Sequence, residues 1–259
     1  MLNKEMSQDV LTIREKIVNW LSNYLLESKK EGYLLGLSGG VDSTVIALLA
    51  REAVERTGKK LLALILPINN DYYDEEMAVS VCKQFGINYK VINMEDNFNL
   101  LKSTVNNTAS RPIVYTNLKA RLRECAIYYY ANNSDHLVLG TVNKGEFTIG
   151  YFPKNATAGD LLPIADLLKS EIREIGKSYG LAEEIVKRKA SGCIWASTAE
   201  EEWGFTEEEL DIMLTALRKG NDGVMTLQGI PQEKKERFLT LYKDSKHKRK
   251  FYPIFKKDK

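Results

Sequence analysis

The segment that most constrains the fold is Leu34 to Ser43, where an apolar run stops at a Ser-Gly-Gly turn and a helical pattern begins at once. This order predicts a strand, a short loop and a helix N-terminus. The two glycines leave the backbone of the turn uncovered, so its amide groups can point at an anion. Ser38 and Ser43 add hydroxyl donors, and Asp42 supplies a carboxylate for a magnesium ion on the phosphate oxygens. The segment therefore predicts a phosphate site.

Apolar runs and helical patterns alternate along the chain. A helix is indicated from Val10 to Leu25 and another over 167–180, closing at Gly180; strands are expected at 33–37, 61–66, 89–93 and 137–141, with helices near 44–57, 74–85 and 117–131. This alternation predicts a doubly wound α/β fold, a mostly parallel sheet with helices on both faces. In such sheets ligands lie beyond the carboxyl ends of the strands, where Ser38 and Thr141 fall.

Length and charge set further bounds. The chain has 259 residues, of which 44% are hydrophobic, and no Pro/Gly/Ser-rich stretch divides it, so we expect a single domain over residues 1–259. The 37 basic and 35 acidic residues leave a formal net charge of +2. A net charge this small gives no overall electrostatic attraction to nucleic acid or acidic membranes, so any anion site must be local.

The sequence also bears on location. Its first ten residues are polar and charged, and its longest apolar runs are too short to span a bilayer, so we expect a cytoplasmic protein without a membrane partner. The three cysteines, Cys82, Cys125 and Cys193, are widely spaced, which favours neither a disulfide framework nor a zinc site. The acidic runs 200–202 and 207–209 are expected to be solvated faces.

The string Ser-Gly-Gly-Val-Asp-Ser at 38–43 resembles the pyrophosphate loop of the ATP pyrophosphatases, which cleave ATP between its α and β phosphates to adenylate a substrate. It is not a Walker loop, because no Gly-Lys-Ser/Thr follows. Further motifs follow in order: Asn117–Arg123, Leu139–Glu146, Gly150–Lys154, Ala158–Ile164, Leu168–Ile172, Gly204–Asp211 and Ser245–Arg249. As a series they resemble the ammonia-dependent NAD synthetases, from about residue 8 to the C-terminus.

The resemblance implies a set of site residues in an adenine nucleotide alpha hydrolase-like fold. ATP would be bound by Gly36, Leu37, Ser38, Gly39, Gly40, Val41, Asp42, Ser43, Thr141, Lys169 and Ser191. Magnesium would be held by Asp42 and Glu146. Deamido-NAD (nicotinic acid adenine dinucleotide) would be contacted by Arg121, Lys154, Asp160, His247 and Lys248. The lysines and the arginine suit substrates that carry several phosphates.

The resemblance also implies a reaction and partners. A carbon–nitrogen ligase of this kind joins the nicotinate carboxylate to the AMP part of ATP, and ammonia then displaces AMP to give NAD. Activation by adenylation requires no covalent enzyme nucleophile. With no glutaminase domain in 259 residues, the nitrogen donor is expected to be free ammonia or ammonia supplied by another protein. A homodimer is expected on family grounds alone.

Two segments depart from the family pattern. The loop between Lys154 and Asp160 is one residue shorter and lacks the usual Gly-Asp pair. Near residue 190, Cys193 stands where the family has a carboxylate, and the segment up to about 204 is also one residue shorter. These changes fall where the acid substrate would be touched or covered. They leave open an alternative, a relative that amidates a different carboxylic acid.

Two other classes of protein remain open. Gly36–Gly40 also satisfies Gly-x-Ser-x-Gly, the nucleophile elbow of serine hydrolases, with His247 downstream. However, His247 lies in a cationic run that disfavours its accepting a proton, and this interpretation gives Asp42 and Glu146 no task. The other class is a nucleotide-binding regulator without catalysis, which the two intact carboxylates disfavour.

Overall fold

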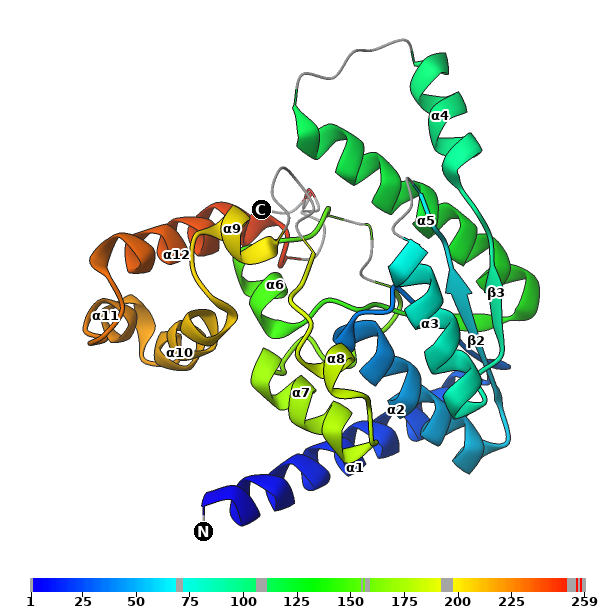
Figure 1. The fold of residues 1–259 in the computed structure, drawn as a ribbon, viewed down its shortest axis with the longest axis horizontal. Coiled ribbons are helices and arrows are strands. Elements are labelled where there is room, and N and C mark those ends of the chain that lie inside the picture. Colours follow the sequence, from blue (N-terminus) through cyan, green and yellow to red (C-terminus); the bar gives the residue numbers. More distant parts are fainter. Residues whose placement is uncertain are drawn as a thin grey trace.

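A four-stranded parallel sheet lies between layers of helices on the right of Figure 1. The computed structural model describes residues 2–68, 72–105, 111–154, 156, 159–191, 198–250, 255 and 257, with the backbone alone for 2–8, 72 and 73. The strands are β1 (Gly32–Gly36), β2 (Lys60–Ile65), β3 (Tyr89–Val91) and β4 (His136–Leu139), in the order β3-β2-β1-β4. All three pairings are parallel, which confirms the predicted sheet and the position of each strand to within two residues.

Helices cover both faces of this sheet. On one face α1 (Leu2–Ser28), α2 (Val41–Thr57), α3 (Tyr72–Phe85) and α7 (Lys169–Ser178) share an apolar cluster with Leu35 of β1. On the other face α5 (Pro112–Ser134) packs against Leu34. Because neighbouring strand residues point to opposite faces, a run that is apolar at every position matches a sheet buried on both sides. The doubly wound fold is thus confirmed.

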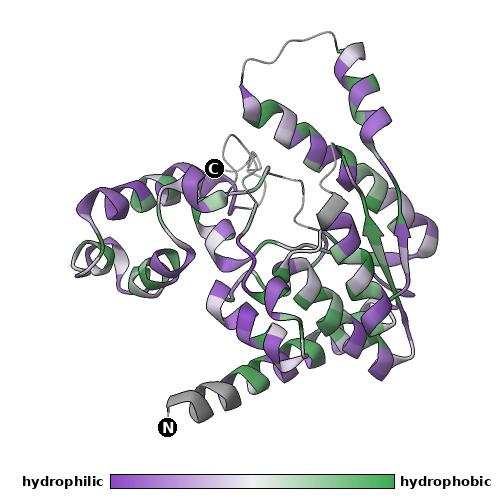
Figure 2. Ribbon diagram, in the orientation of Figure 1, coloured by the Kyte–Doolittle hydropathy of each residue, from purple (hydrophilic) through white to green (hydrophobic). Residues whose placement is uncertain are grey.

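Helix α2 lies deepest in the molecule. Most of its side chains from Val41 to Val54 are buried, so its sequence is apolar on all sides rather than along one stripe. It ends at Gly58, whose φ of 68° is the left-handed conformation of a helix C-cap. At its other end it begins at Val41, three residues before the predicted start. Figure 2 shows hydrophobic residues gathered along α2 and the strands.

The C-terminal third is helical and has a second apolar cluster, which includes Trp203, Met213 and Phe238. Its elements are α8 (Glu183–Val186), α9 (Ala199–Trp203), α10 (Glu207–Leu217), α11 (Gly220–Met225), α12 (Gln232–Asp244) and the 3-10 helix η1 (Ser245–His247). The two remaining helices come earlier in the chain: α4 (Glu95–Thr104) and α6 (Lys144–Ile149). The single domain over the whole chain stays a prediction. Across the described residues, no helix has the length and apolar character needed to cross a membrane.

Helix α10 joins this region to the sheet layer through Asp211. The Asp211 carboxylate accepts the backbone N–H of Lys169 at 3.2 Å, the N–H of Ser170 at 3.0 Å and the Ser170 hydroxyl at 2.7 Å. These groups belong to the first turn of α7, whose own N-cap residue is Leu168 and has no side-chain oxygen. A residue of α10 therefore caps α7.

We expect Asp211→Ala to lower the free energy of unfolding by about 1–2 kcal/mol, because two N–H groups at the start of α7 lose their acceptor. Urea unfolding followed by circular dichroism measures the change. Glu208→Ala is the matched control, since that side chain is 72% exposed and lies on the same helix. Equal stability of the Asp211 variant and the wild type would contradict the cap.

Candidate active site

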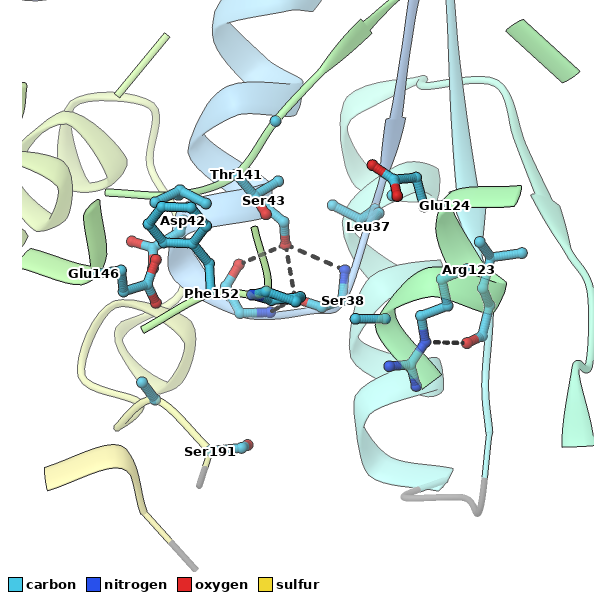
Figure 3. A pocket seen from close by; sticks show the side chains of 18 of the residues that line it. Leu37, Ser38, Asp42, Ser43, Arg123, Glu124, Thr141, Glu146, Phe152 and Ser191 are labelled. Carbon is cyan, nitrogen blue, oxygen red and sulfur yellow. Dashed lines mark hydrogen bonds between the residues drawn. The ribbon is translucent and has the colours of Figure 1, made fainter. Parts of the chain in front are cut away.

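A closed ring of hydrogen bonds shapes the loop between β1 and α2 (Figure 3). The hydroxyls of Ser38 and Ser43 lie 3.0 Å apart, and the Ser43 hydroxyl also accepts the Ser38 N–H at 3.2 Å. The N–H of Gly40 donates to the Ser38 hydroxyl at 3.3 Å. Gly40 is the N-cap of α2, and no described side chain caps that helix. The helix N-terminus thus has the geometry that suits an anion, and its binding of phosphate stays a prediction.

Gly39 is required in this loop for two reasons. Its φ of 79° lies in the left-handed region, and a Cβ placed there would be 2.7 Å from the carbonyl oxygen of Asp74 in α3. At Gly40, by contrast, the nearest atom to an added Cβ is the Ser38 hydroxyl at 3.5 Å. The close approach of α3 to the loop therefore depends on the first glycine and not on the second.

The turn after β4 brings a second carboxylate to the loop. Asn143 caps α6 through its side chain, which accepts the Glu146 N–H at 2.9 Å, while the Glu146 carboxylate accepts the Asn143 N–H at 3.1 Å. The Asn143 amide also donates to the Asp42 carboxylate at 3.2 Å. One asparagine thus connects both predicted magnesium ligands. The capping box is visible in the sequence as Asn-x-x-Glu, but the contact with Asp42 is not.

Lys169 is the cation of the site. Its ammonium lies 2.7 Å from Oδ2 of Asp42, and its side chain is 8% exposed. Burial lowers the pKa of Lys169, but the negative charges of Asp42, Glu207 and Glu146 outweigh burial and raise it. For Glu146, burial and then the charge of Asp42 raise the pKa to about 8. Three carboxylates, Asp42, Glu146 and Glu207, thus act on this one ammonium, and Arg173 pairs with the last of them.

This cluster of carboxylates suits a divalent cation. Oδ1 of Asp42 is buried and has no hydrogen-bond partner among the described residues. Such an oxygen is costly to bury unless a cation or donor satisfies it, and carboxylate oxygens are the ligands that Mg²⁺ prefers. No group of three or more His, Cys, Asp or Glu with metal-binding geometry occurs in the part of the chain that the structure describes. Phosphate oxygens and water would have to complete the coordination.

A cavity of about 660 Å³ contains these groups. It is lined by ten of the eleven residues predicted to bind ATP, and by Glu146: Gly36, Leu37, Ser38, Gly40, Val41, Asp42, Ser43, Thr141, Lys169 and Ser191. Figure 3 shows Asp42 and Glu146 on one side of the loop, with Arg123 and Glu124 on the other. Arg123 is held there by donating to the Leu66 carbonyl at 2.8 Å. The sequence interpretation did not include Arg123 or Glu124 in the site.

The predicted deamido-NAD residues are less closely assembled. Lys248 lines the cavity and donates to the carbonyls of Gly150 and Phe152, each at 2.7 Å. Arg121 and His247 are exposed and, with Lys154 and Asp160, are not among the cavity-lining residues. Their assignment to substrate stays a prediction.

Asp160 has a structural role. Its carboxylate accepts the Val138 N–H of β4 at 2.8 Å and the Tyr128 hydroxyl at 3.2 Å, so it fixes the end of the last strand. Cys193 and residues 155, 157 and 158 of the shortened loop lie outside the described residues.

The expectation for the acidic runs is wrong at two positions. Glu202 and Glu207 are 7% and 4% exposed, not solvated. Glu202 accepts the hydroxyl of Tyr151, and Glu207 pairs with Arg173 and Lys169. Charge runs in a sequence predict exposure only on average, and here partners brought in by the fold compensate burial. The sequence also did not predict the ion pair between Arg188 and Asp74, both of which line the cavity.

A phosphate loop at the carboxyl edge of a parallel sheet, facing paired carboxylates, marks a nucleotide-binding enzyme of the doubly wound α/β class. Comparison with known families is more specific. The family model for NAD synthase matches residues 13–252, and the chain belongs to that family.

Relatives agree with this assignment. The chain is 40% identical over 202 residues to the NH(3)-dependent NAD(+) synthetase of Carboxydothermus hydrogenoformans, covering 76% of this chain and 82% of the relative. It is 36% identical to that of Thermococcus sibiricus, covering 94% and 96%. Among solved structures, NMN synthetase from Francisella tularensis is similar with a TM-score of 0.82 and 33% identity, covering 95% and 98%. The NH3-dependent NAD synthetase from Campylobacter jejuni is similar with a TM-score of 0.78 and 25% identity, and the match covers 95% of this chain and 99% of that one.

We expect Gly39→Ala to destabilise the protein by about 1–3 kcal/mol, because the new Cβ meets a backbone oxygen and the left-handed φ is strained. Gly40→Ala should change stability by less than about 0.5 kcal/mol, since its added Cβ meets only ordinary contacts. Urea midpoints of both variants measure the difference. Equal urea midpoints for the two variants would contradict the requirement for glycine at position 39.

Proposed function

We propose that this protein catalyses the ATP-dependent amidation of deamido-NAD by ammonia, giving NAD, AMP and pyrophosphate, as a carbon–nitrogen ligase. Its membership of the NAD synthase family supports this reaction, as do NH(3)-dependent NAD(+) synthetases that are 33–40% identical to it over most of the chain. The observation that carries the proposal is the convergence of Asp42, Glu146 and Lys169 on one side of the phosphate loop within one cavity.

The residues present suit the first chemical step. An oxygen of the nicotinate carboxylate bonds to the α-phosphorus of ATP while the bond from that phosphorus to the bridging oxygen breaks, which releases pyrophosphate. Negative charge builds up on the departing group. The free N–H groups at the start of α2 and the ammonium of Lys169 stabilise it.

In the second step the nitrogen of ammonia bonds to the acyl carbon, AMP leaves, and the nitrogen loses a proton. The activated acyl group makes this possible without a nucleophile from the protein. The serine-hydrolase interpretation finds less support, because the Ser38 hydroxyl is 3.0 Å from Ser43, within the loop's own hydrogen-bonded ring. His247 is exposed, and its ring Nδ1 lies 3.0 Å from the Asp244 carbonyl.

Mg²⁺ is the cofactor we propose, held by Asp42 and Glu146. The buried Oδ1 of Asp42, which no described residue hydrogen-bonds, supports the assignment. When bound, the ion would offset charge on the phosphate oxygens. Lys169 pairs with Oδ2 of the same carboxylate, so a bound cation would compete with its ammonium for the charge of Asp42.

We also propose a homodimer that takes ammonia from solution or from another protein in the cytoplasm, without nucleic acid or membrane partners. Large apolar side chains on α4 and α5 support a protein contact there: Leu100 is 67% exposed, Val114 48% and Tyr129 72%. A contact with a second copy would cover these side chains.

The identity of the acid can be tested directly. NMN synthetase from Francisella tularensis is 33% identical to this chain, so the acid that corresponds to NMN is the natural competitor of deamido-NAD. We expect kcat/KM for deamido-NAD to exceed that for the mononucleotide acid by about tenfold or more, because the second nucleotide adds contacts. Amide formation is measured by mass spectrometry with ATP, Mg²⁺ and ammonia. A preference for the mononucleotide would overturn this choice of acid.

Removal of either carboxylate should abolish pyrophosphate release. We expect Asp42→Asn and Glu146→Gln each to lower kcat by about 100-fold or more, since each replaces a carboxylate that would hold the proposed cation by a neutral amide. Asp166→Asn is the control, because its side chain is 96% exposed. Thermal unfolding checks that all three variants fold. Near-normal turnover in either variant would remove the magnesium assignment.

A further inference from the structure

A second carboxylate reaches Lys169 from outside the phosphate loop. Glu207 is the first residue of α10 and is 4% exposed. Its Oε1 lies 3.6 Å from the Lys169 ammonium, and its Oε2 pairs with the Arg173 guanidinium. The family resemblance assigned this residue no role. A buried carboxylate this close to the cation of the site requires a reason.

Four alternating charges follow one another here: Asp42, Lys169, Glu207 and Arg173. The side chain of Arg173 is 19% exposed and is itself fixed, because its Nε donates to the Val186 carbonyl at 3.0 Å. Lys169 and Arg173 are one helical turn apart on α7, so Glu207 faces both at once. Glu207 is therefore held in a defined position next to the lysine.

Helix α10 contacts the start of α7 twice. Asp211 accepts the backbone N–H groups of Lys169 and Ser170, and Glu207, one turn earlier, faces the Lys169 side chain. The backbone and the ammonium of the same lysine are thus both placed by carboxylates of α10. A structural cap alone would need only Asp211.

The two carboxylates around Lys169 have different tasks. Asp42 is also a proposed magnesium ligand, and a bound divalent cation competes with the ammonium for its charge. With Asp42 as its single partner, the buried ammonium would then lose compensation when the cation and ATP arrive. Glu207 does not line the cavity and is kept in place by Arg173. Its charge therefore remains available to Lys169 when Asp42 turns to another partner.

We propose that Glu207 is a positioning residue, which keeps the Lys169 ammonium directed into the phosphate cavity after Asp42 has engaged a cation, with Arg173 fixing Glu207 in turn. The inference rests on the proposed function, since it assumes that Lys169 acts on ATP. It adds α10 to the machinery of ATP cleavage.

The test compares Glu207→Gln with Glu208→Gln. Both remove one negative charge from the same turn of α10, but the Glu208 side chain is 72% exposed and 3.6 Å from Arg173. For Glu207→Gln we expect kcat of pyrophosphate release to fall about tenfold to 100-fold, as for a misplaced catalytic group, with KM for deamido-NAD within about twofold of wild type. Glu208→Gln should behave as wild type. Unchanged kcat in Glu207→Gln would overturn the proposal.

A double-mutant cycle separates positioning from folding. In a Lys169→Gln background, measured by single-turnover pyrophosphate release, Glu207→Gln should cause no further loss, because the residue it positions is gone. An equal fractional loss with and without Lys169 would show that Glu207 acts on the fold instead, and would overturn the proposal. If Glu207→Gln does not fold, Arg173→Gln takes its place in the same cycle, because it removes the partner that fixes Glu207.

The wild type distinguishes this inference from the proposed function. Failure of the wild-type protein to amidate deamido-NAD rejects the proposed reaction. If the wild type turns over normally but the losses from Glu207→Gln and Lys169→Gln are additive, the proposed reaction stands and only the positioning role of Glu207 is rejected.

Discussion

The ion pair between Asp42 and Lys169 is the contact on which the rest of the site depends. It joins the first turn of α2 to the first turn of α7, two residues separated by 127 positions in the chain, at 2.7 Å. The start of α2, whose backbone N–H groups favour anions, and the Lys169 side chain at the start of α7 thereby line the same cavity. Asn143 adds the turn after β4 to this pair by donating to the same carboxylate oxygen. Three chain segments meet at one oxygen atom, Oδ2 of Asp42, while Oδ1 has no hydrogen-bond partner in the described part of the chain.

The ion pair also explains why the C-terminal helices belong to the site although they lie outside the sheet layer. A buried lysine needs compensation from every side on which water is excluded. Asp42 supplies it from the loop and Glu207 from α10, while Asp211 fixes the backbone from which the lysine projects. The second apolar cluster, around Phe238 and Met213, holds α10 at the required position. Packing far from the phosphate loop is in this way coupled to the charge arrangement beside it.

Much of this was predictable from the sequence, and the reason for the rest is physical. Local patterns gave the four strands, α2 and the loop, because apolar runs and Ser-Gly-Gly turns act over a few residues. Most of the residues predicted to bind ATP line the cavity because they form one contiguous segment, 36–43, whereas Thr141, Lys169 and Ser191 were placed there by the family resemblance. Glu207 was expected to be solvated, since a run of three glutamates shows its charge but not its partners. Its pairing with Arg173 and Lys169 arises from helix packing, which a local pattern does not contain.

Two parts of the cavity lining are held in place by different interactions. Around Asp42 and Lys169, buried charges fix one another, so a change at one position disturbs the others. Lys248, also in the cavity lining, donates to the backbone carbonyls of Gly150 and Phe152, and its segment is placed by close packing: a Cβ at Gly150 would lie 2.2 Å from Cβ of Ser245. Side chains there can change without removing a charge partner. Solved structures similar to this chain include an NMN synthetase and an NAD synthetase, so we expect the part held by charge pairs to be shared among them and the part around Lys248 to vary with the acid.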